Sequence, residues 1–220
     1  MSATASIPWP NIRRSLVAIL RGIAPHEAEA VVAALIEEGF EAIEIPLNSP
    51  DPFRSIAAAA RLAPAGVLIG AGTVLETGEV DRLADVGGRL MVSPNVEPEV
   101  IRRASALGMV TMPGVLTPTE ALQALKAGAS GLKFFPASLL GPAGIAAISV
   151  VLPADTEIGA VGGVADKDFA AYAAAGVRTF GLGSSLFKPG LAAGEVRARA
   201  RATITAYDAV FGTELPRAVG

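Results

Sequence analysis

Short apolar segments rich in β-branched residues recur along the chain at intervals of roughly 20 to 30 residues, and an alanine-rich segment with helical periodicity follows most of them. These apolar segments predict eight strands, at 17–20, 42–45, 67–71, 89–93, 109–113, 131–135, 157–161 and 178–182. The sequence between them predicts helices over 25–38, 52–62, 77–86, 98–107, 118–127, 143–151 and 166–175. Several of these helices begin with proline in the first turn and end at glycine, which is the usual asymmetry of helix termini.

An alternation of strand and helix repeated eight times predicts a single (β/α)8 TIM barrel of the α/β class. The length of 220 residues fits one such barrel, and no linker-like segment divides the chain. We expect one domain in which the barrel occupies residues 15–207. Residues 1–14 predict an N-terminal arm or helix across the bottom of the barrel, and residues 208–220 predict a polar C-terminal tail.

The composition excludes several kinds of protein. Hydrophobic residues make up 51% of the chain, which excludes intrinsic disorder. The formal net charge is −3 and the basic side chains are scattered, so we expect no nucleic-acid partner. With no cysteine and a single histidine, His26, the chain has no disulfides, no thiolate metal sites and no site built on several histidines. Any chemistry must use lysine, arginine, carboxylate or hydroxyl side chains, or the backbone.

One segment imitates a membrane span. Residues 134–154 contain no charged side chain and are long enough to cross a bilayer, but three prolines interrupt them. The N-terminal residues lack the charge order of a secretory signal, because their arginines follow the apolar residues. We therefore expect a soluble, cytoplasmic protein that does not associate with a membrane.

Two ionisable residues lie inside otherwise apolar strands, close to the C-terminal ends where barrels carry their functional groups. Strand alternation places Glu44 on the same face as Ala42, and Lys133 on the same face as Gly131 and Phe135. Because small residues beside a charged one leave room inside a crowded barrel, Glu44 and Lys133 are predicted to point inward. They are expected to meet at the mouth of the barrel.

Lys133 differs from the other lysines of the chain, since Lys126, Lys167 and Lys188 occupy positions typical of solvated side chains. Burial lowers the pKa of a lysine, and the neutral amine attacks carbonyl carbons. A neighbouring Glu44 carboxylate opposes that shift in pKa. We therefore expect that the pair exchanges a proton, or that the entry of substrate changes the charges of both groups. The alternatives are a lysine that extends to water and a carboxylate in a core ion pair.

Two glycine-rich turns follow the last two predicted strands, at Gly162 and Gly163 and at Gly183 and Ser184. In such barrels the exposed backbone N–H groups of this region form a phosphate site. Glycine also serves any tight turn after a strand, so either turn alone indicates little. The two turns together predict a phosphate site.

Other residues at the strand ends are candidates for holding the rest of a substrate. Arg21 and Thr73 can hydrogen-bond a carboxylate, or they can simply cap a helix and end a strand. Pro94 and Phe135 are expected to line the pocket, where an aromatic wall would keep water from a Schiff base. Packing alone is the alternative for Phe135.

The same positions lie in segments that resemble the KDPG/KDPGal aldolase family, the class I aldolases that cleave 2-keto-3-deoxy-6-phospho-aldonates. The similar segments are AILRG at 18–22, AIEIPLNSP at 42–50, IGAGTV at 69–74, VSPN at 92–95, LKFFP at 132–136, AVGG at 160–163 and GLGS at 181–184. The resemblance extends over residues 16–207 and depends on the whole set of segments.

The resemblance implies that Lys133 forms the Schiff base, that Glu44 transfers protons and that Arg21 and Thr73 hold the substrate. It implies that the phosphate is held by Gly162, Gly163, Gly183 and Ser184. It further implies a phosphorylated keto acid as substrate, pyruvate and glyceraldehyde 3-phosphate as products, a homotrimer, and no metal or organic cofactor.

Two positions depart from the gluconate-type members of the family. Those enzymes usually carry arginine four residues after the catalytic glutamate and threonine before the double glycine, where this chain has Asn48 and Val161. The departure resembles the galactonate branch, so the expected reaction is cleavage of 2-dehydro-3-deoxy-6-phosphogalactonate. The alternatives are a gluconate-type or dual-specificity aldolase, a metal-assisted barrel aldolase and a non-catalytic sugar-phosphate binding barrel.

Overall fold

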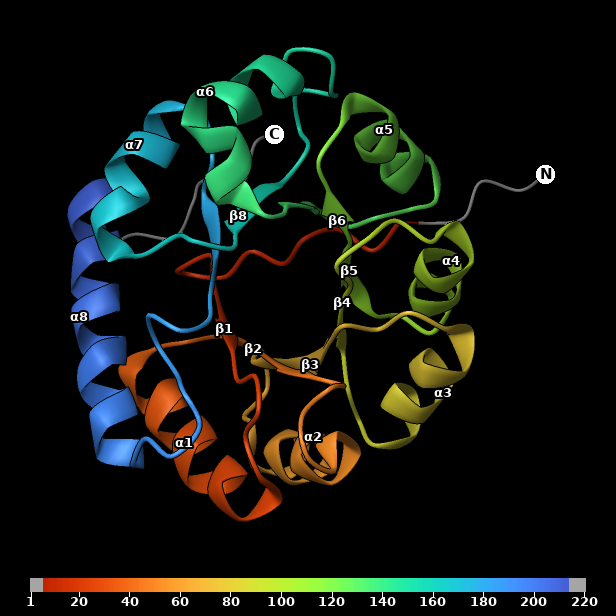
Figure 1. The fold of residues 1–220 in the computed structure, drawn as a ribbon. Helices are drawn as coiled ribbons and strands as arrows, with labels where there is room; N and C mark the ends of the chain where they lie inside the picture. The colour runs from red at the N-terminus through yellow and green to blue at the C-terminus, as the bar shows by residue number, and fades with distance from the viewer. Residues whose placement is uncertain (1–5, 214–220) are drawn as a thin grey trace.

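The computed structural model describes residues 6–213, which form a ring of parallel strands surrounded by helices (Figure 1). The strands are β1 (Leu16–Ile19), β2 (Ala42–Pro46), β3 (Leu68–Gly72), β4 (Leu90–Val92), β5 (Val110–Met112), β6 (Gly114–Val115), β7 (Leu132–Phe134), β8 (Ile158–Val161) and β9 (Thr179–Leu182). The helices are α1 (Pro25–Glu38), α2 (Pro52–Leu62), α3 (Thr77–Asp85), α4 (Pro98–Ala106), α5 (Pro118–Lys126), α6 (Ala137–Ser149), α7 (Phe169–Ala174) and α8 (Ala193–Phe211), and a 3-10 helix, η1 (Asp166–Asp168), precedes α7. The α/β barrel predicted from the alternation of elements is confirmed.

The ring of strands is closed by the segment 110–115, which contains both β5 and β6. The strand order is β5-β4-β3-β2-β1-β9-β8-β7-β6, with parallel pairing between neighbours. β5 pairs with β4 and β6 pairs with β7, while only Pro113 separates β5 from β6. The fifth predicted strand is therefore one segment that changes partners at a proline, which has no backbone N–H for a ladder. This accounts for nine strands in residues 6–213 where the sequence predicts eight.

Two apolar clusters stabilise the barrel. One fills the layer between the strands and the outer helices. The other lies inside the ring at its N-terminal end and includes Val17 and Leu90. The N-terminal arm closes this end, because Ile12 belongs to the inner cluster and Ile7 and Trp9 pack against it. The arm thus covers the bottom of the barrel as predicted, without helix in residues 6–14.

The helix after β7 begins earlier than its sequence predicts. α6 starts at Ala137 rather than at 143, because helical turns form on both sides of Gly141. Gly141 has φ 63° and ψ 176°, a conformation that glycine adopts readily and that joins the two helical pieces at a kink. Pro142 then occupies the first turn of the second piece, where its missing N–H costs nothing.

The last helix continues beyond the predicted start of the tail at 208. α8 ends at Phe211, and the Asp208 carboxylate accepts two hydrogen bonds from Arg14, each of 2.6 Å. The Phe211 ring stacks on Tyr207, with 4.5 Å between ring centroids. These contacts hold the final turn in place, so the prediction for 208–211 is wrong, and residues 214–220 lie outside the described part of the chain.

The uncharged stretch 134–154 is divided between the end of β7, α6 and the turns that follow α6. Within residues 6–213, no helix combines the length and the apolar character needed to cross a membrane.

Candidate active site

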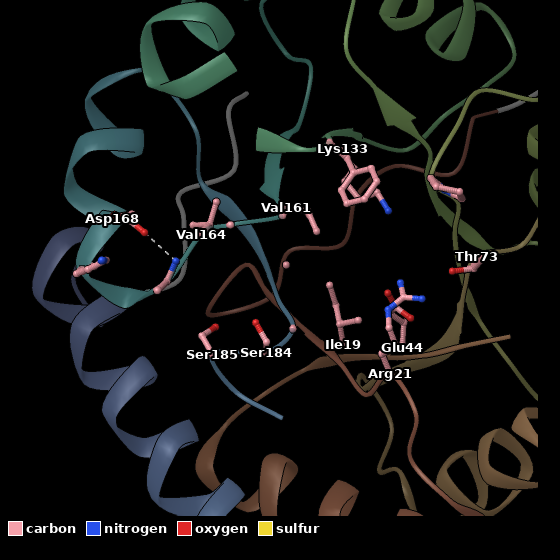
Figure 2. A pocket seen from close by; sticks show the side chains of 18 residues that line it. Ile19, Arg21, Glu44, Thr73, Lys133, Val161, Val164, Asp168, Ser184 and Ser185 are labelled. Atoms are coloured by element: carbon pink, nitrogen blue, oxygen red, sulfur yellow. Dashed lines mark hydrogen bonds between the residues drawn. The ribbon is translucent and has the colours of Figure 1, made fainter. Parts of the chain in front are cut away.

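A cavity of about 460 Å³ lies at the C-terminal ends of the strands, inside the mouth of the ring (Figure 2). Most of the predicted site residues line it, namely Arg21, Glu44, Thr73, Pro94, Lys133, Phe135, Val161, Gly162, Gly163, Gly183 and Ser184. They come from strands far apart in the sequence, which the closed ring brings to one place. The strand-end reasoning therefore located the cavity correctly.

Lys133 is the middle residue of β7 and is only 6% exposed. Figure 2 shows its amine pointing into the cavity, toward the side where Glu44 and Arg21 lie. The amine nitrogen lies 4.9 Å from the centre of the Phe135 ring. Burial lowers the pKa of Lys133 to about 8; the Glu44 carboxylate opposes this shift and Arg21 adds to it. A useful fraction of the amine is therefore neutral near physiological pH.

Glu44 is the middle residue of β2 and is 3% exposed. Its Oε2 atom is buried and has no hydrogen-bond partner. Burial raises the pKa of Glu44 to about 7, while the charges of Lys133 and Arg21 act in the opposite direction. The carboxyl can therefore both accept and donate a proton near neutral pH.

Arg21 follows β1 and is exposed at the mouth of the cavity. Its Nη1 atom donates a hydrogen bond of 2.8 Å to Oδ1 of Asn48. Asn48 itself is not among the residues that line the cavity. Asn48 is therefore placed to orient Arg21.

Thr73 follows β3 with φ 58°, in the left-handed region that a β-branched residue rarely adopts. The next residue, Val74, donates its N–H to the carbonyl of Val92 at 3.2 Å, which ties the segment to β4. Figure 2 shows the Thr73 hydroxyl directed into the cavity. Backbone strain held by neighbouring strands is typical of residues that touch a ligand.

The other side of the cavity carries neutral donors. Gly162 and Gly163 turn the chain after β8 with φ 90° and 77°. A side chain at Gly163 would collide with Ser138, because a Cβ built on Gly163 would lie only 2.7 Å from the Cβ of Ser138. Ser184 and Ser185 lie on this side as well (Figure 2). Backbone N–H groups and hydroxyls gathered in a turn are suited to a phosphate.

Sequence reasoning missed part of the cavity wall, which also includes Ile19, Val164, Ala165, Lys167, Asp168, Gly181 and Ser185. The sequence predicts Lys167 at an ordinary solvated position in the first turn of a helix. It is exposed, but it also lines the cavity. Its closeness in sequence to the Gly162–Gly163 turn is the signal that could have identified it.

The cavity has the charges of a site for an organic anion. Its cations are Arg21, Lys133 and Lys167, and its carboxyl groups are Glu44 and Asp168. Within residues 6–213, no group of three or more histidine, cysteine, aspartate and glutamate side chains is arranged to hold a metal ion. The absence of a metal or cofactor requirement stays a prediction.

Enzymes that use a lysine to attack a carbonyl carbon need an amine that loses its proton easily and a proton-transfer group beside it. In this barrel Lys133 of β7 is such an amine, and Glu44 of β2 is such a proton-transfer group. Comparison with known proteins agrees with this class. Residues 12–204 match the family described as KDPG and KHG aldolase, and the chain belongs to that family.

Individual relatives are similar over nearly their whole length. The chain is 72% identical to a probable 2-dehydro-3-deoxy-6-phosphogalactonate aldolase of Rhizobium meliloti, over 94% of this chain and 97% of the relative. It is 49% identical to the 2-dehydro-3-deoxy-6-phosphogalactonate aldolase of Escherichia coli, over 87% and 94%. A solved structure described as native KDPGal superposes with a TM-score of 0.90 at 47% identity, covering 92% of this chain and 98% of that one.

Proposed function

We propose that this protein cleaves 2-dehydro-3-deoxy-6-phosphogalactonate to pyruvate and D-glyceraldehyde 3-phosphate through a Schiff base on Lys133. The observation that carries the proposal is the pairing of a buried amine, Lys133, with a buried carboxyl, Glu44, in one cavity. The names of the relatives from Rhizobium meliloti and Escherichia coli support this substrate.

The two anionic ends of the substrate determine its orientation. Arg21 and Thr73 lie on the same side of the cavity as Glu44 and would hold the C1 carboxylate (Figure 2). The turns at Gly162–Gly163 and at Gly183–Ser184 would hold the phosphate on the opposite side. This orientation brings the C2 carbonyl to the amine of Lys133.

The first half of the reaction joins substrate to enzyme. The neutral Nζ of Lys133 forms a bond to C2, and the carbonyl oxygen becomes the hydroxyl of a carbinolamine. Protonated Glu44 gives its proton to that hydroxyl, water leaves and a positively charged iminium forms. A pKa of about 7 for Glu44 and of about 8 for Lys133 provides both starting forms near neutral pH.

The second half breaks the carbon chain. The Glu44 carboxylate takes the proton of the C4 hydroxyl, the C3–C4 bond breaks and its electron pair moves toward the iminium to give an enamine. Glyceraldehyde 3-phosphate leaves with the new C4 carbonyl. Glu44 then returns the proton to C3, and water hydrolyses the resulting iminium to pyruvate and the neutral Lys133 amine. The Glu44 carboxylate takes up the proton that this hydrolysis releases, which restores the starting forms of both groups.

The preference for the galactonate epimer is attributed to the wall between the two ends of the cavity. Val161 and Ile19 contribute apolar surface there, packed close to Gly181, at which a Cβ would approach Val161 Cγ2 to 2.6 Å. Valine offers no hydroxyl to the C4 hydroxyl of the gluconate epimer, and Asn48 leaves Arg21 as the cation at the carboxylate end. Val161 is the feature that can distinguish the epimers, because the C1 carboxylate is the same in both.

Trapping tests the covalent step. Sodium borohydride added with pyruvate should reduce the iminium and add the pyruvate-derived mass to Lys133, located by peptide mass spectrometry. A Lys133→Met variant should bind pyruvate without forming the adduct. If the unmodified protein binds pyruvate and gives no adduct on Lys133, the proposal is wrong.

Turnover assays test the substrate and the alternatives. Pyruvate release from the two C4 epimers should be faster for the galactonate compound, and equal or reversed rates would favour dual or gluconate specificity. Release from neither would indicate a sugar-phosphate binding barrel. Activity should persist after treatment with EDTA and dialysis, because the proposed chemistry uses no metal or organic cofactor.

A homotrimer in the cytoplasm completes the proposal. The segment that holds α6 exposes three large apolar side chains, Leu139 at 73%, Val150 at 83% and Val151 at 56%, which supports burial against another subunit. The cytoplasm is proposed because a phosphorylated, multiply charged substrate does not cross a bilayer unaided. Light scattering should give three times the chain mass, and Val150→Glu should lower it.

A further inference from the structure

An unassigned cation, Lys167, lies at the end of the cavity where the proposed function places the phosphate. Lys167 belongs to η1, shortly after the Gly162–Gly163 turn, and lines the same cavity as that turn. Its neighbour Asp168 appears in Figure 2 beside Val164 and on the same side as Ser184. The amine of Lys133 lies across the cavity from this group of residues.

We propose that Lys167 contacts the phosphate of the substrate and thereby makes the enzyme selective for phosphorylated substrates. This inference rests on the proposed function. The other two cations of the cavity, Arg21 and Lys133, are placed beside Glu44 at the carboxylate end. Without Lys167, a phosphate dianion would meet only neutral serine and backbone donors at its own end.

The carboxylates next to Lys167 have other partners. Asp168 Oδ2 accepts the backbone N–H of Ala165 at 2.9 Å, and Asp166 Oδ1 accepts the backbone N–H of Lys167 at 2.8 Å. Lys167 takes part in none of the ion pairs found in the described part of the chain. Its ammonium group therefore has the freedom to approach an incoming anion.

The contact between Asp168 and Ala165 also shapes this end of the cavity. It ties η1 back to the segment that leaves the Gly162–Gly163 turn (Figure 2). Because Asp168 uses one carboxylate oxygen for this bond, its charge is partly offset by a fixed donor. Hydrogen bonds within residues 165–168 thus hold the backbone of Lys167 close to the Gly162–Gly163 turn.

Lys167 is exposed, so its effect is expected on capture of the substrate rather than on bond breaking. Water screens the charge, and a contact of this kind contributes modestly to affinity. The expected signature is a change in KM for phosphorylated substrates, with kcat unchanged. An unphosphorylated substrate should not respond.

The test compares two aldehydes in the condensation direction, D-glyceraldehyde 3-phosphate and D-glyceraldehyde, each with saturating pyruvate. Lys167→Ala should raise KM for the phosphorylated aldehyde on the order of two- to fivefold, and Lys167→Glu should raise it further. Lys167→Arg should stay close to the unmodified enzyme. Lys188→Ala is the matched control, because Lys188 is an exposed lysine that does not line the cavity.

A binding measurement without turnover separates this inference from the proposed function. Titration calorimetry with glycerol 3-phosphate should show weaker binding in Lys167→Glu and unchanged binding in Lys188→Ala. An unchanged affinity in Lys167→Glu, or an equal rise of KM for both aldehydes, overturns the inference. Failure of the Lys133 trapping reaction, with the calorimetric difference retained, overturns the aldolase mechanism and leaves the phosphate contact supported.

Discussion

The Glu44 carboxylate lies in the space that a side chain at position 72 would occupy. Gly72 ends β3, which pairs with β2, and a Cβ built on Gly72 would overlap both carboxylate oxygens of Glu44. Because Gly72 of β3 has no side chain, the Glu44 carboxylate of the neighbouring strand β2 has room at this place in the cavity.

Gly72→Ala should slow the reaction, because Glu44 transfers protons both in Schiff-base formation and in bond breaking. The added methyl group must push the Glu44 carboxylate aside, and a displacement of about 1 Å at a reacting group costs on the order of 100-fold in rate. We expect kcat to fall by about this factor and borohydride to trap pyruvate on Lys133 more slowly. Steady-state kinetics and peptide mass spectrometry measure the two effects.

Gly78→Ala is the control for that substitution. Gly78 lies in α3, and a Cβ there would have no heavy atom within 4 Å. Alanine is also the better helix former, so stability should stay equal or rise slightly. Unchanged kcat in Gly72→Ala would mean that Glu44 does not depend on this space.

Activity should be greatest between pH 7 and 8 and fall on either side. Lys133, whose pKa burial lowers to about 8, gains a proton as the pH falls through that value and loses its nucleophilicity. Glu44, whose pKa burial raises to about 7, loses the proton that Schiff-base formation uses as the pH rises through that value. The dependence of kcat/KM on pH should therefore be bell-shaped, with Lys133 in the acid limb and Glu44 in the alkaline limb, and a flat profile from pH 6 to 9 would contradict this assignment.

Glu44→Gln should lower the pKa of Lys133 below its value in the unmodified protein. The Glu44 carboxylate raises that pKa, whereas burial and Arg21 lower it, and the substitution removes only the first effect. The rate of reductive methylation of Lys133, followed by mass spectrometry across pH, should reach half-maximum at a lower pH. The labelling profile of the exposed Lys188 in the same samples serves as the internal control.

The barrel and the central pair of the site could be predicted because both depend on local patterns. The alternation of apolar segments with alanine-rich segments defines strands and helices one at a time. The two-residue period of a strand places Lys133 and Glu44 on the inward face without knowledge of the partner strands. The C-terminal ends of parallel strands then meet by the rules of the fold.

The features that sequence reasoning missed depend on contacts between distant segments. The role of Gly72 follows from the register between β2 and β3, which no local pattern contains. The place of Lys167 on the cavity wall follows from the direction in which the segment after β8 leaves the ring. The final turn of α8 depends on Asp208 and its bond to Arg14, 194 positions earlier in the chain.

Arg21→Ala should raise KM for pyruvate in the condensation direction. A hydrogen bond from a charged donor is worth about 1.5 to 3 kcal/mol, which corresponds to roughly 10- to 100-fold in affinity. Arg21→Lys should recover only part of the loss, because an ammonium group cannot form the paired hydrogen bonds of a guanidinium. Asn48→Ala should have a smaller effect in the same direction, since Asn48 orients Arg21 through one hydrogen bond of 2.8 Å. An unchanged KM in Arg21→Ala would remove it from the carboxylate site.

Asp208→Asn should destabilise the fold without changing the active site. The Arg14 and Asp208 side chains are only 10% and 18% exposed and form two hydrogen bonds that join the N-terminal arm to α8. Removing one charge leaves the guanidinium poorly solvated, at a cost of about 2 to 4 kcal/mol in the free energy of unfolding. Asp81→Asn is the control, because its partner Arg103 and Asp81 itself are nearly half exposed, and exposed pairs contribute about 0 to 1 kcal/mol. Urea unfolding measures both values, and similar losses would show that burial does not strengthen the Arg14–Asp208 pair.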